Sequence, residues 1–356
     1  MIVRPTLVLA LSGLLAAPVS AQLQRIVLQG SGDPTVHTDL ATAIAAAQPG
    51  DHLHLSGGTF TLTGGITLSK PLHFIGAGIH PDSSNVTATT TIATTGNSQA
   101  HVAVTTAASG SSFTGIIFSP STNGAGFVYG TNADDDDPQG LVFQRCEFKR
   151  YVQMGAEEGA NGSGTFDECI FRGASNMGMS GMGSRAVFTR CIFDGGPINN
   201  FRPSGLFMRN CVVMGSRLQN SSNAIVQNCI FSYDGAPLWQ VGGVQISNCL
   251  VTGSTMFSNS SGNSETNNTY GIPAASLFVN ETDGSLQFTD DLHLAAGSPG
   301  IGGGNDGRDI GLHGSNSPQK PGYVPFNPHY QQADFAPSTN WMGELPVQIR
   351  TAAQSH

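Results

Sequence analysis

One short phrase recurs six times between residues 140 and 253, and each copy contains one of the chain's six cysteines. In order, the copies are FQRCEF, FDECIF, FTRCIF, MRNCVV, VQNCIF and ISNCLV, with Cys146, Cys169, Cys191, Cys211, Cys229 and Cys249. Successive cysteines are 23, 22, 20, 18 and 20 residues apart. A period of about twenty residues with one short strand per repeat is typical of a β-solenoid, in which each repeat forms one coil of a stack.

The positions within each repeat predict where its side chains point. The cysteine and the residue two places later share a parity on a strand, so both are expected inside: the second set is Phe148, Phe171, Phe193, Val213, Phe231 and Val251. The residue before each cysteine is Arg145, Glu168, Arg190, Asn210, Asn228 or Asn248. Because asparagine tolerates the left-handed conformation of a sharp bend, this position predicts a corner with a stacked polar ladder.

The six cysteines are expected to be buried free thiols. Six cysteines in an exported chain would ordinarily suggest three disulfides. Stacked parallel strands instead hold equivalent Cβ atoms about 4.8 Å apart with parallel Cα–Cβ bonds, a geometry unsuited to a disulfide. A single file of cysteines also provides no tetrahedral cage for a metal.

The residue directly after each cysteine should point outward. Five of the six are aliphatic and would form a stripe, which consists of Ile170, Ile192, Val212, Ile230 and Leu250. Soluble monomers rarely leave such a stripe exposed, so something is expected to cover it. Our hypothesis is that the C-terminal tail, residues 315–356, does so, and the alternative is a partner protein or a polymer.

The first 21 residues have the features of a signal peptide. Arg4 precedes an apolar run from Leu7 to Ala17 that is too short to span a bilayer, and small residues lead to a cleavage site near Ala21–Gln22. No later window is apolar enough to be transmembrane, so we expect a secreted protein, extracellular or at the cell surface. The net charge of −9 argues against nucleic acid as a partner.

The rest of the chain is expected to form one β-helix domain, residues 22–314, followed by the Pro- and aromatic-rich tail packed on it. Residues 37–48 predict a short helix with Leu40, Ile44 and Ala47 on one face, which would cap the open apolar end of the solenoid. Residues 140–253 are the cysteine-ladder coils. Residues 259–270, which are mostly polar, are expected to be a loop.

Several segments resemble the right-handed parallel β-helix, or pectin lyase-like, superfamily. Residues 49–78, with PGD, GGTF and KPLHFIGAG, resemble its N-terminal coils, and the cysteine phrases resemble its short β-helix repeat. Residues 292–314 resemble the closing segment of bacterial secreted β-helix-repeat proteins. The resemblance covers roughly residues 35–260 and implies an all-β, right-handed single-stranded solenoid of about ten coils. It does not fix an activity, because the same fold serves lyases, hydrolases, epimerases and adhesins.

Nine of the fifteen Lys and Arg residues lie between Arg145 and Arg217. In register, Arg145, Glu168 and Arg190 form one ladder, and Lys149, Arg172 and Asp194 form another. One interpretation is opposite-charge pairing between neighbouring strands, worth a few tenths of a kcal/mol per pair at a surface. The other is a groove for the carboxylates of an acidic polysaccharide, with Arg145, Lys149, Arg172 and Arg190 as binding residues.

Candidate catalytic residues are few. A polysaccharide lyase needs a cation beside the uronate carboxylate and a base for the C5 proton, and Lys149, Arg150 and Arg172, with Tyr151, could serve. A hydrolase would need converging carboxylates, for which Asp167, Glu168 and Asp194 are the densest set. No nucleophile elbow, phosphate-cradling loop or zinc motif is present in the sequence.

Four consecutive aspartates, Asp134, Asp135, Asp136 and Asp137, are candidate Ca²⁺ ligands. Their spacing matches no calcium loop, so a solvated acidic turn is the favoured interpretation. No other cofactor is indicated. The sequence therefore favours a non-catalytic secreted or cell-surface protein that binds extracellular polysaccharide, or a surface protein, with a rigid solenoid face. The alternative is a polysaccharide lyase acting on an acidic glycan.

Overall fold

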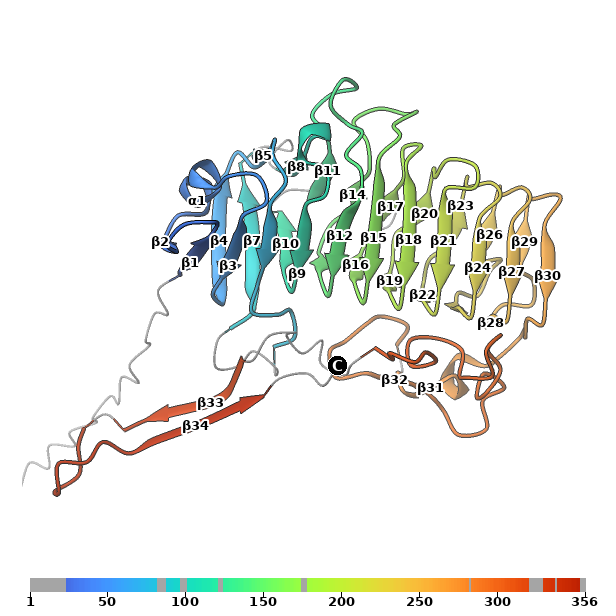
Figure 1. Cartoon of the computed structure of the whole chain (residues 1–356). Coiled ribbons are helices and arrows are strands. Elements are labelled where there is room, and N and C mark those ends of the chain that lie inside the picture. Colours follow the sequence, from blue (N-terminus) through green and yellow to red (C-terminus); the bar gives the residue numbers. More distant parts are fainter. Residues whose placement is uncertain are drawn as a thin grey trace, which may run out of the picture.

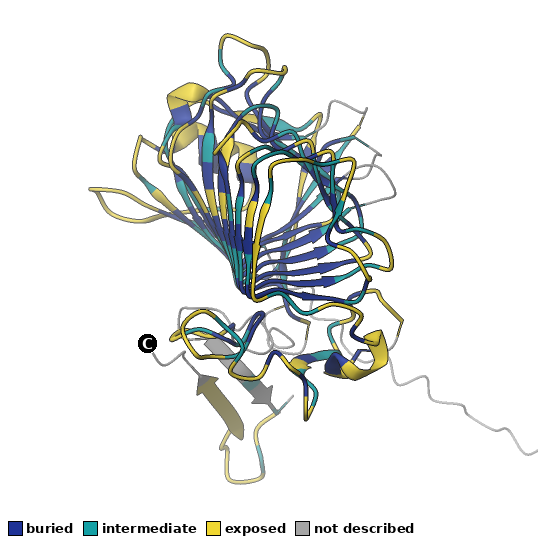
Figure 2. Cartoon of the chain, turned by 90° about the vertical axis from the view of Figure 1, so that its right-hand side faces the viewer, coloured by how far each residue is buried: buried dark blue, intermediate teal, exposed yellow. Residues whose placement is uncertain are grey.

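The computed structural model describes residues 24–81, 88–96, 101–120, 124–173, 178–281, 283–319, 329–336 and 338–352. Short strands wind around a single apolar interior and stack into an elongated solenoid (Figure 1). The end-on view shows that the strands form three walls and that much of their length is buried (Figure 2). Each wall is a sheet, named A, B or C in the order in which one coil passes through them.

Sheet A has twelve strands. In spatial order they are β2 (Thr35–His37), β1 (Ile26–Gln29), β3 (His52–Leu55), β6 (His73–Ile75), β9 (Ser112–Thr114), β12 (Leu141–Gln144), β15 (Ser163–Asp167), β18 (Arg185–Thr189), β21 (Leu206–Arg209), β24 (Ile225–Gln227), β27 (Gln245–Ser247) and β30 (Ser264–Thr266). All pairs are parallel except the two that involve β1, which is antiparallel to both of its neighbours.

Sheets B and C have nine parallel strands each, so the described chain makes nine complete turns where the sequence predicted about ten. Sheet B consists of β4 (Gly58–Thr63), β7 (Thr90–Thr95), β10 (Ile117–Pro120), β13 (Glu147–Phe148), β16 (Ile170–Arg172), β19 (Ile192–Asp194), β22 (Val212–Met214), β25 (Ile230–Ser232) and β28 (Leu250–Val251). Sheet C consists of β5 (Ile66–Leu68), β8 (Val102–Val104), β11 (Phe127–Tyr129), β14 (Val152–Gln153), β17 (Met179–Ser180), β20 (Ile198–Asn199), β23 (Leu218–Gln219), β26 (Leu238–Trp239) and β29 (Phe257–Ser258).

The interior contains the two predicted ladders. All six cysteines are free and fully buried, as the sequence predicted. Aromatic rings stack from coil to coil, with centroids 4.6 Å apart for Phe143 and Phe166 and 4.8 Å apart for Phe171 and Phe193. These separations match the spacing of paired strands, so the side-chain stacking repeats the backbone pairing.

The corner between sheets A and B is also as predicted. All six residues that precede a cysteine are left-handed, with φ between 52° and 54°, and Asn267 (φ 53°) continues the series. In the next position Asn268 takes the place of a cysteine, and its Oδ1 accepts a hydrogen bond from the Cys249 amide (3.0 Å). Residues 259–270 are therefore a further coil containing β30, and the expectation of a loop there was wrong because a polar coil lacks the cysteine signature.

The N-terminal cap is built around helix α1 (Leu40–Ala46), which is shorter than the predicted 37–48. It begins later because His37 ends strand β2, which pairs antiparallel with β1. Asp39 caps the helix, accepting from the Thr42 amide (2.7 Å). Leu40, Ile44 and Ala47 are buried, as predicted. Strand β1 also pairs antiparallel with β3 and so covers the first coil of sheet A.

Residues 270–319 run back along the outside of sheet B (Figure 1). They include the 3-10 helix η2 (Ala274–Ser276) and the antiparallel pair β31 (Phe278–Asn280) and β32 (Asp291–Leu294); a second 3-10 helix, η1 (Thr106–Ala108), lies between sheets C and A. The aliphatic stripe is buried beneath this segment, with Ile192 and Ile230 only 2% and 1% exposed. The covering residues are Ile272, Leu277, Phe278, Leu286, Leu292, Ile310 and Leu312.

The cover is therefore intramolecular, but our hypothesis named the wrong segment. The tail forms a hairpin of β33 (His329–Phe335) and β34 (Val347–Ala352). In that hairpin Leu345, Val347 and Ile349 are about half exposed. That the tail packs along the solenoid stays a prediction. The predicted signal peptide, residues 1–21, lies outside the described residues.

Candidate functional site

Most of the basic cluster is part of the scaffold. Arg145 and Glu168 are both buried, and the Arg145 Nε lies 2.9 Å from the Glu168 Oε2. This pair was expected on the surface, but the left-handed corner turns both side chains under the chain. An ion pair removed from water cannot readily exchange its carboxylate for that of a ligand.

Arg190 and Arg172 join the coils to the covering segment. The Arg190 Nη2 lies 2.6 Å from both Asp167 oxygens, and Nη1 donates to the carbonyl of Ser317. The Arg172 Nε lies 2.5 Å from Glu147, while Nη1 lies 2.8 Å from Asp194. Three of the four predicted binding residues thus have carboxylate partners already.

Burial raises the pKa of Asp167 and of Asp194. The neighbouring guanidinium groups of Arg190 and Arg172 oppose that rise. Arg172 Nη1 also donates to the Leu286 carbonyl (2.8 Å), so it serves the covering segment as well as the coils. Asp167, Glu168 and Asp194 each face an arginine, and the structure does not bring them together around a vacant site as a hydrolase would need.

Lys149 and Arg150 are different. They follow β13 at the corner between sheets B and C, and Lys149 is exposed while Arg150 is half-buried. Neither forms an ion pair with a carboxylate in the described chain. Tyr151 comes next and lines a hollow on sheet C. Of the predicted catalytic set, Tyr151 is therefore the residue that lines a cavity, and Lys149 and Arg150 precede it in the chain.

The four aspartates form a turn between β11 and β12. Asp135 accepts from the Thr131 and Asn132 amides, and the buried Asp136 accepts from the Ala156 amide (2.8 Å). Asp137 accepts from the Asn161 amide. These carboxylates hold backbone groups of neighbouring loops, and no group of three or more potential metal-ligating side chains with metal-site geometry occurs in the part of the chain that the structure describes.

The outer face of sheet C presents a continuous polar ladder. Strand register places Gln153, Ser180, Asn199, Gln219, Trp239 and Ser258 in one line, one residue per coil. Two adjoining hollows of about 550 and 250 Å³ lie along its first part, and Tyr151 and Gln153 line both. Gln153, Ser180 and Asn199 therefore line a groove on sheet C, and the ladder continues beyond it through Gln219, Trp239 and Ser258.

Several polar side-chain atoms along this ladder have no hydrogen-bond partner among the described residues. The Tyr151 hydroxyl donates to the Gln153 Oε1 (2.6 Å), which fixes both at one end. Within the described residues, the side chains of Ser180 and Gln219 have no hydrogen-bond partner, and the Asn199 Oδ1 is buried and unpaired. Arg217 lies over the Trp239 ring, 4.8 Å from its centroid. Amides, hydroxyls and aromatic rings in a row can bind the hydroxyl groups and apolar faces of sugars.

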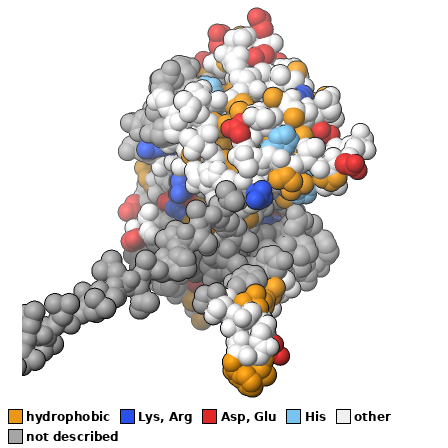
Figure 3. Space-filling model, turned by 90° about the vertical axis from the view of Figure 1, so that its left-hand side faces the viewer, with side chains coloured by type: hydrophobic (Ala, Val, Ile, Leu, Met, Phe, Trp, Pro, Cys, Tyr) orange, Lys and Arg blue, Asp and Glu red, His pale blue; other side chains and the backbone are white. Residues whose placement is uncertain are grey.

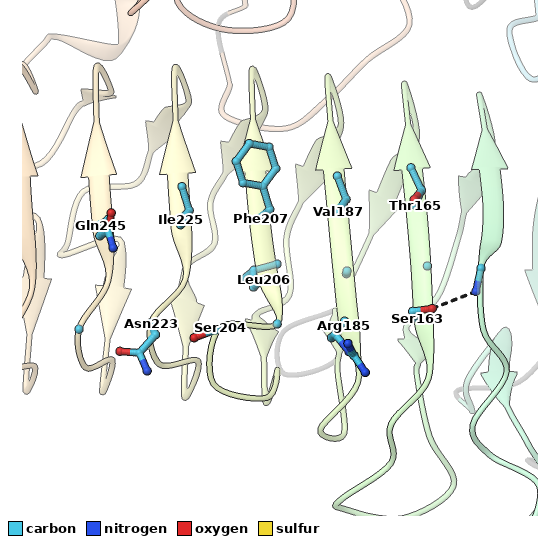
Figure 4. Close-up of a pocket in the computed structure, with 15 residues that line it drawn as sticks. Ser163, Thr165, Arg185, Val187, Ser204, Leu206, Phe207, Asn223, Ile225 and Gln245 are labelled. Carbon is cyan, nitrogen blue, oxygen red and sulfur yellow. Dashed lines mark hydrogen bonds between the residues drawn. The ribbon is translucent and has the colours of Figure 1, made fainter.

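Sheet A has a hollow of its own, of about 600 Å³, on its outer face (Figure 4). Thr165, Val187, Phe207, Ile225 and Gln245 stand in a row across five strands, and Figure 4 shows their side chains side by side. Arg185, Ser204 and Asn223 lie along one rim. This floor is mainly apolar, which distinguishes it from the polar floor on sheet C.

Neither hollow was found from the sequence. On sheet C, the signal was an apolar residue followed by a polar one after five of the six cysteines: Val152-Gln153, Met179-Ser180, Ile198-Asn199, Leu218-Gln219 and Phe257-Ser258. After Cys229 the pair is Leu238-Trp239. Its distance from the cysteine varies with the loop at the corner between sheets B and C, so the pattern does not align in the sequence. Among the described residues no helix is long and apolar enough to span a membrane.

Comparison with known families supports this architecture. The family model described as a right handed beta helix region matches residues 135–284. That range includes the cysteine-ladder coils and the coil after them. No curated protein matches the chain, and no solved structure does. The match describes the fold of the coils and does not indicate what their outer faces bind.

Proposed function

This chain is a right-handed parallel β-helix, consistent with the pectin lyase-like superfamily, and from that premise we propose that it is an exported, non-catalytic protein that binds polysaccharide along the outer face of sheet C. The observation that carries the proposal is the polar ladder from Gln153 to Gln219, of which Gln153, Ser180 and Asn199 line two adjoining hollows. The side chains of Ser180 and Gln219 have no hydrogen-bond partner among the described residues. One polar side chain about every 4.8 Å suits a polymer of sugars, whose hydroxyl groups also recur along a line.

The ion pairs of the arginine side chains support a binding function without catalysis. Arg145, Arg172 and Arg190 already pair with carboxylates, so an acidic sugar would have to displace an internal partner. The groove floor is uncharged, which suits a glycan recognised through hydroxyl groups. Export is supported by the sequence of residues 1–21, and mass spectrometry of the mature protein from the medium would find its N-terminus at Gln22.

Binding can be tested with the mature chain by affinity electrophoresis in gels that contain neutral or acidic polysaccharides. We expect retardation by at least one polymer. Gln219→Ala and Ser180→Ala should each weaken binding about two- to tenfold, as expected for the loss of one hydrogen bond. Thr165→Ala is the matched control, because Thr165 lies in the same coil as Ser180 but on sheet A. Equal weakening by the control, or no retardation by any polymer, would contradict the proposal.

A lyase is the second candidate, favoured by one observation: Lys149 and Arg150 lack carboxylate partners among the described residues and adjoin Tyr151 at the groove. A lyase would form an unsaturated uronate, detected by ultraviolet absorbance during incubation with uronic acid polymers. Activity that disappears in Lys149→Ala or Tyr151→Phe would establish this alternative and overturn the non-catalytic proposal.

A further inference from the structure

The turn of the C-terminal hairpin presents apolar side chains on an ordered backbone. Asn340 Oδ1 accepts from the amides of Met342 and Glu344, both at 2.9 Å, and the Asn340 Nδ2 donates to the Glu344 Oε2 (2.9 Å). Trp341 is 92% exposed and Met342 58% exposed on this turn. Figure 3 shows hydrophobic side chains gathered at the projecting end of the described tail. An exposed tryptophan on a fixed turn is typical of a residue that docks into a pocket.

The same chain has an apolar hollow that could accept such a side chain. On the outer face of sheet A, Val187 is 38% exposed and Phe207 and Ile225 are half-buried. Gly164, Ala186 and Gly205 also line this hollow, and all three are buried. The volume of about 600 Å³ falls in the range of pockets that enclose large side chains or small ligands. Figure 4 shows the apolar row open toward the viewer.

Charges at the two surfaces are complementary. Arg185 lies on the rim of the hollow, donates to the Asn161 Oδ1 (2.9 Å) and has no ion pair with a described carboxylate. Arg202 donates to the same Asn161 oxygen and likewise lacks an ion pair within the described chain. On the hairpin, Glu344 lies three residues from Trp341 and pairs with no cation among the described residues. Opposite charges beside two apolar surfaces give both attraction and orientation.

We propose that the Trp341–Met342 turn of one copy docks into the sheet A hollow of a second copy, with Glu344 facing Arg185 and Arg202. The two surfaces differ, so each copy offers one of each and the contact is head-to-tail. One turn in one hollow buries less than the roughly 1,200 Å² of a stable interface, so association is expected to be weak and concentration-dependent. The proposal uses a face other than the glycan groove and stands independently of it.

The test is sedimentation velocity of the mature chain across a concentration series. The sedimentation coefficient of the wild type should rise with concentration, while Trp341→Ala and Phe207→Thr should each remain monomeric. Both substitutions are at exposed or half-buried sites, and thermal melting followed by circular dichroism will show that each variant is folded. A wild type that stays monomeric throughout, including one whose turn occupies its own hollow, would overturn the proposal.

Two further arms identify the contact. An equimolar mixture of Trp341→Ala and Phe207→Thr should form dimers but no larger species, because one chain retains the hollow and the other the turn. Arg185→Glu or Glu344→Arg should each weaken association several-fold, and the two together in one chain should restore it. If the mixture forms no dimers, the proposed contact between turn and hollow is wrong. It is also wrong if the protein associates and neither Trp341→Ala nor Phe207→Thr reduces that association.

Discussion

Asn228 and Asn305 are joined by two hydrogen bonds across 77 residues of chain. The Asn228 Nδ2 donates to the Asn305 Oδ1 (3.0 Å), and the Asn305 amide donates to the Asn228 Oδ1 (3.0 Å). Neighbouring corner residues act in the same way: Asn210 donates to the carbonyls of Gly311 and Gly314, and Asn248 to that of Gly303. The corner ladder therefore does two things, since it bends each coil and holds the covering segment.

Asn228→Ala should separate these two roles from each other. Alanine loses the paired hydrogen bonds, worth about 1–3 kcal/mol, and adopts the left-handed corner at a cost of about 1–2 kcal/mol. Asn228→Gly loses the same hydrogen bonds without the backbone cost, because glycine is at ease at φ 53°. We expect both variants to unfold at lower urea concentration than the wild type, with the alanine variant lower. Equal midpoints would show that the corner is unstrained.

Glu168→Gln should destabilise the fold strongly. It removes the Glu168 charge that pairs with the buried Arg145 guanidinium, and breaking a buried pair in this way costs about 3–5 kcal/mol. The control is Asp306→Asn, which breaks the more exposed Arg209–Asp306 pair and should cost less than about 1 kcal/mol. Thermal melts of both variants provide the comparison. Similar losses would mean that Arg145 reaches water in solution.

The six cysteines should be unreactive in the native protein. All are fully buried, which keeps a reagent away from every sulfur atom. Burial raises the pKa of the Cys146, Cys191, Cys211 and Cys229 thiols. At Cys169 burial is outweighed by hydrogen bonds with Cys146 and Cys191, which lower its pKa to about 6, but its sulfur is as buried as the others. A thiol reagent such as DTNB should label none in the folded chain and all six after denaturation without a reductant. Fewer than six in the denatured protein would reveal a disulfide and contradict the stacked geometry.

Acid should weaken the covering segment through His313. Burial lowers the pKa of His313 to about 4, and its ring stacks on that of His293 at 3.6 Å. The unfolded chain binds this proton near pH 6.5, so stability is complete above that pH and is lost as pH falls toward 4. For a ring that is partly exposed, we expect a loss of about 1–2 kcal/mol. In the His313→Gln variant, the urea midpoint should change less between pH 6.5 and 4.5 than it does in the wild type. An unchanged slope would show that His313 is not its source.

Much of the solenoid could be predicted because its repeats are local and strict. The cysteine phrase fixed the direction of the corner, the interior ladders and the outward stripe, since each follows from strand parity. The cover of that stripe was misplaced because the packing of residues such as Leu312 against the stripe spans far more chain than a repeat does. The sequence analysis also placed the Arg145–Glu168 ion pair on the surface, whereas it is buried. A sequence shows which charged residues share a register, but it does not show how far the corner turns their side chains inward.

The position of the cover after the coils has a consequence for biosynthesis. In a chain made from its N-terminus, Ile170 through Leu250 emerge before Leu312, which packs over the same sheet. Translation of the 62 residues between Leu250 and Leu312 takes about 3–12 s at roughly 5–20 residues per second. During that interval the nascent coils expose an uninterrupted aliphatic surface, which is the kind of surface that chaperones recognise.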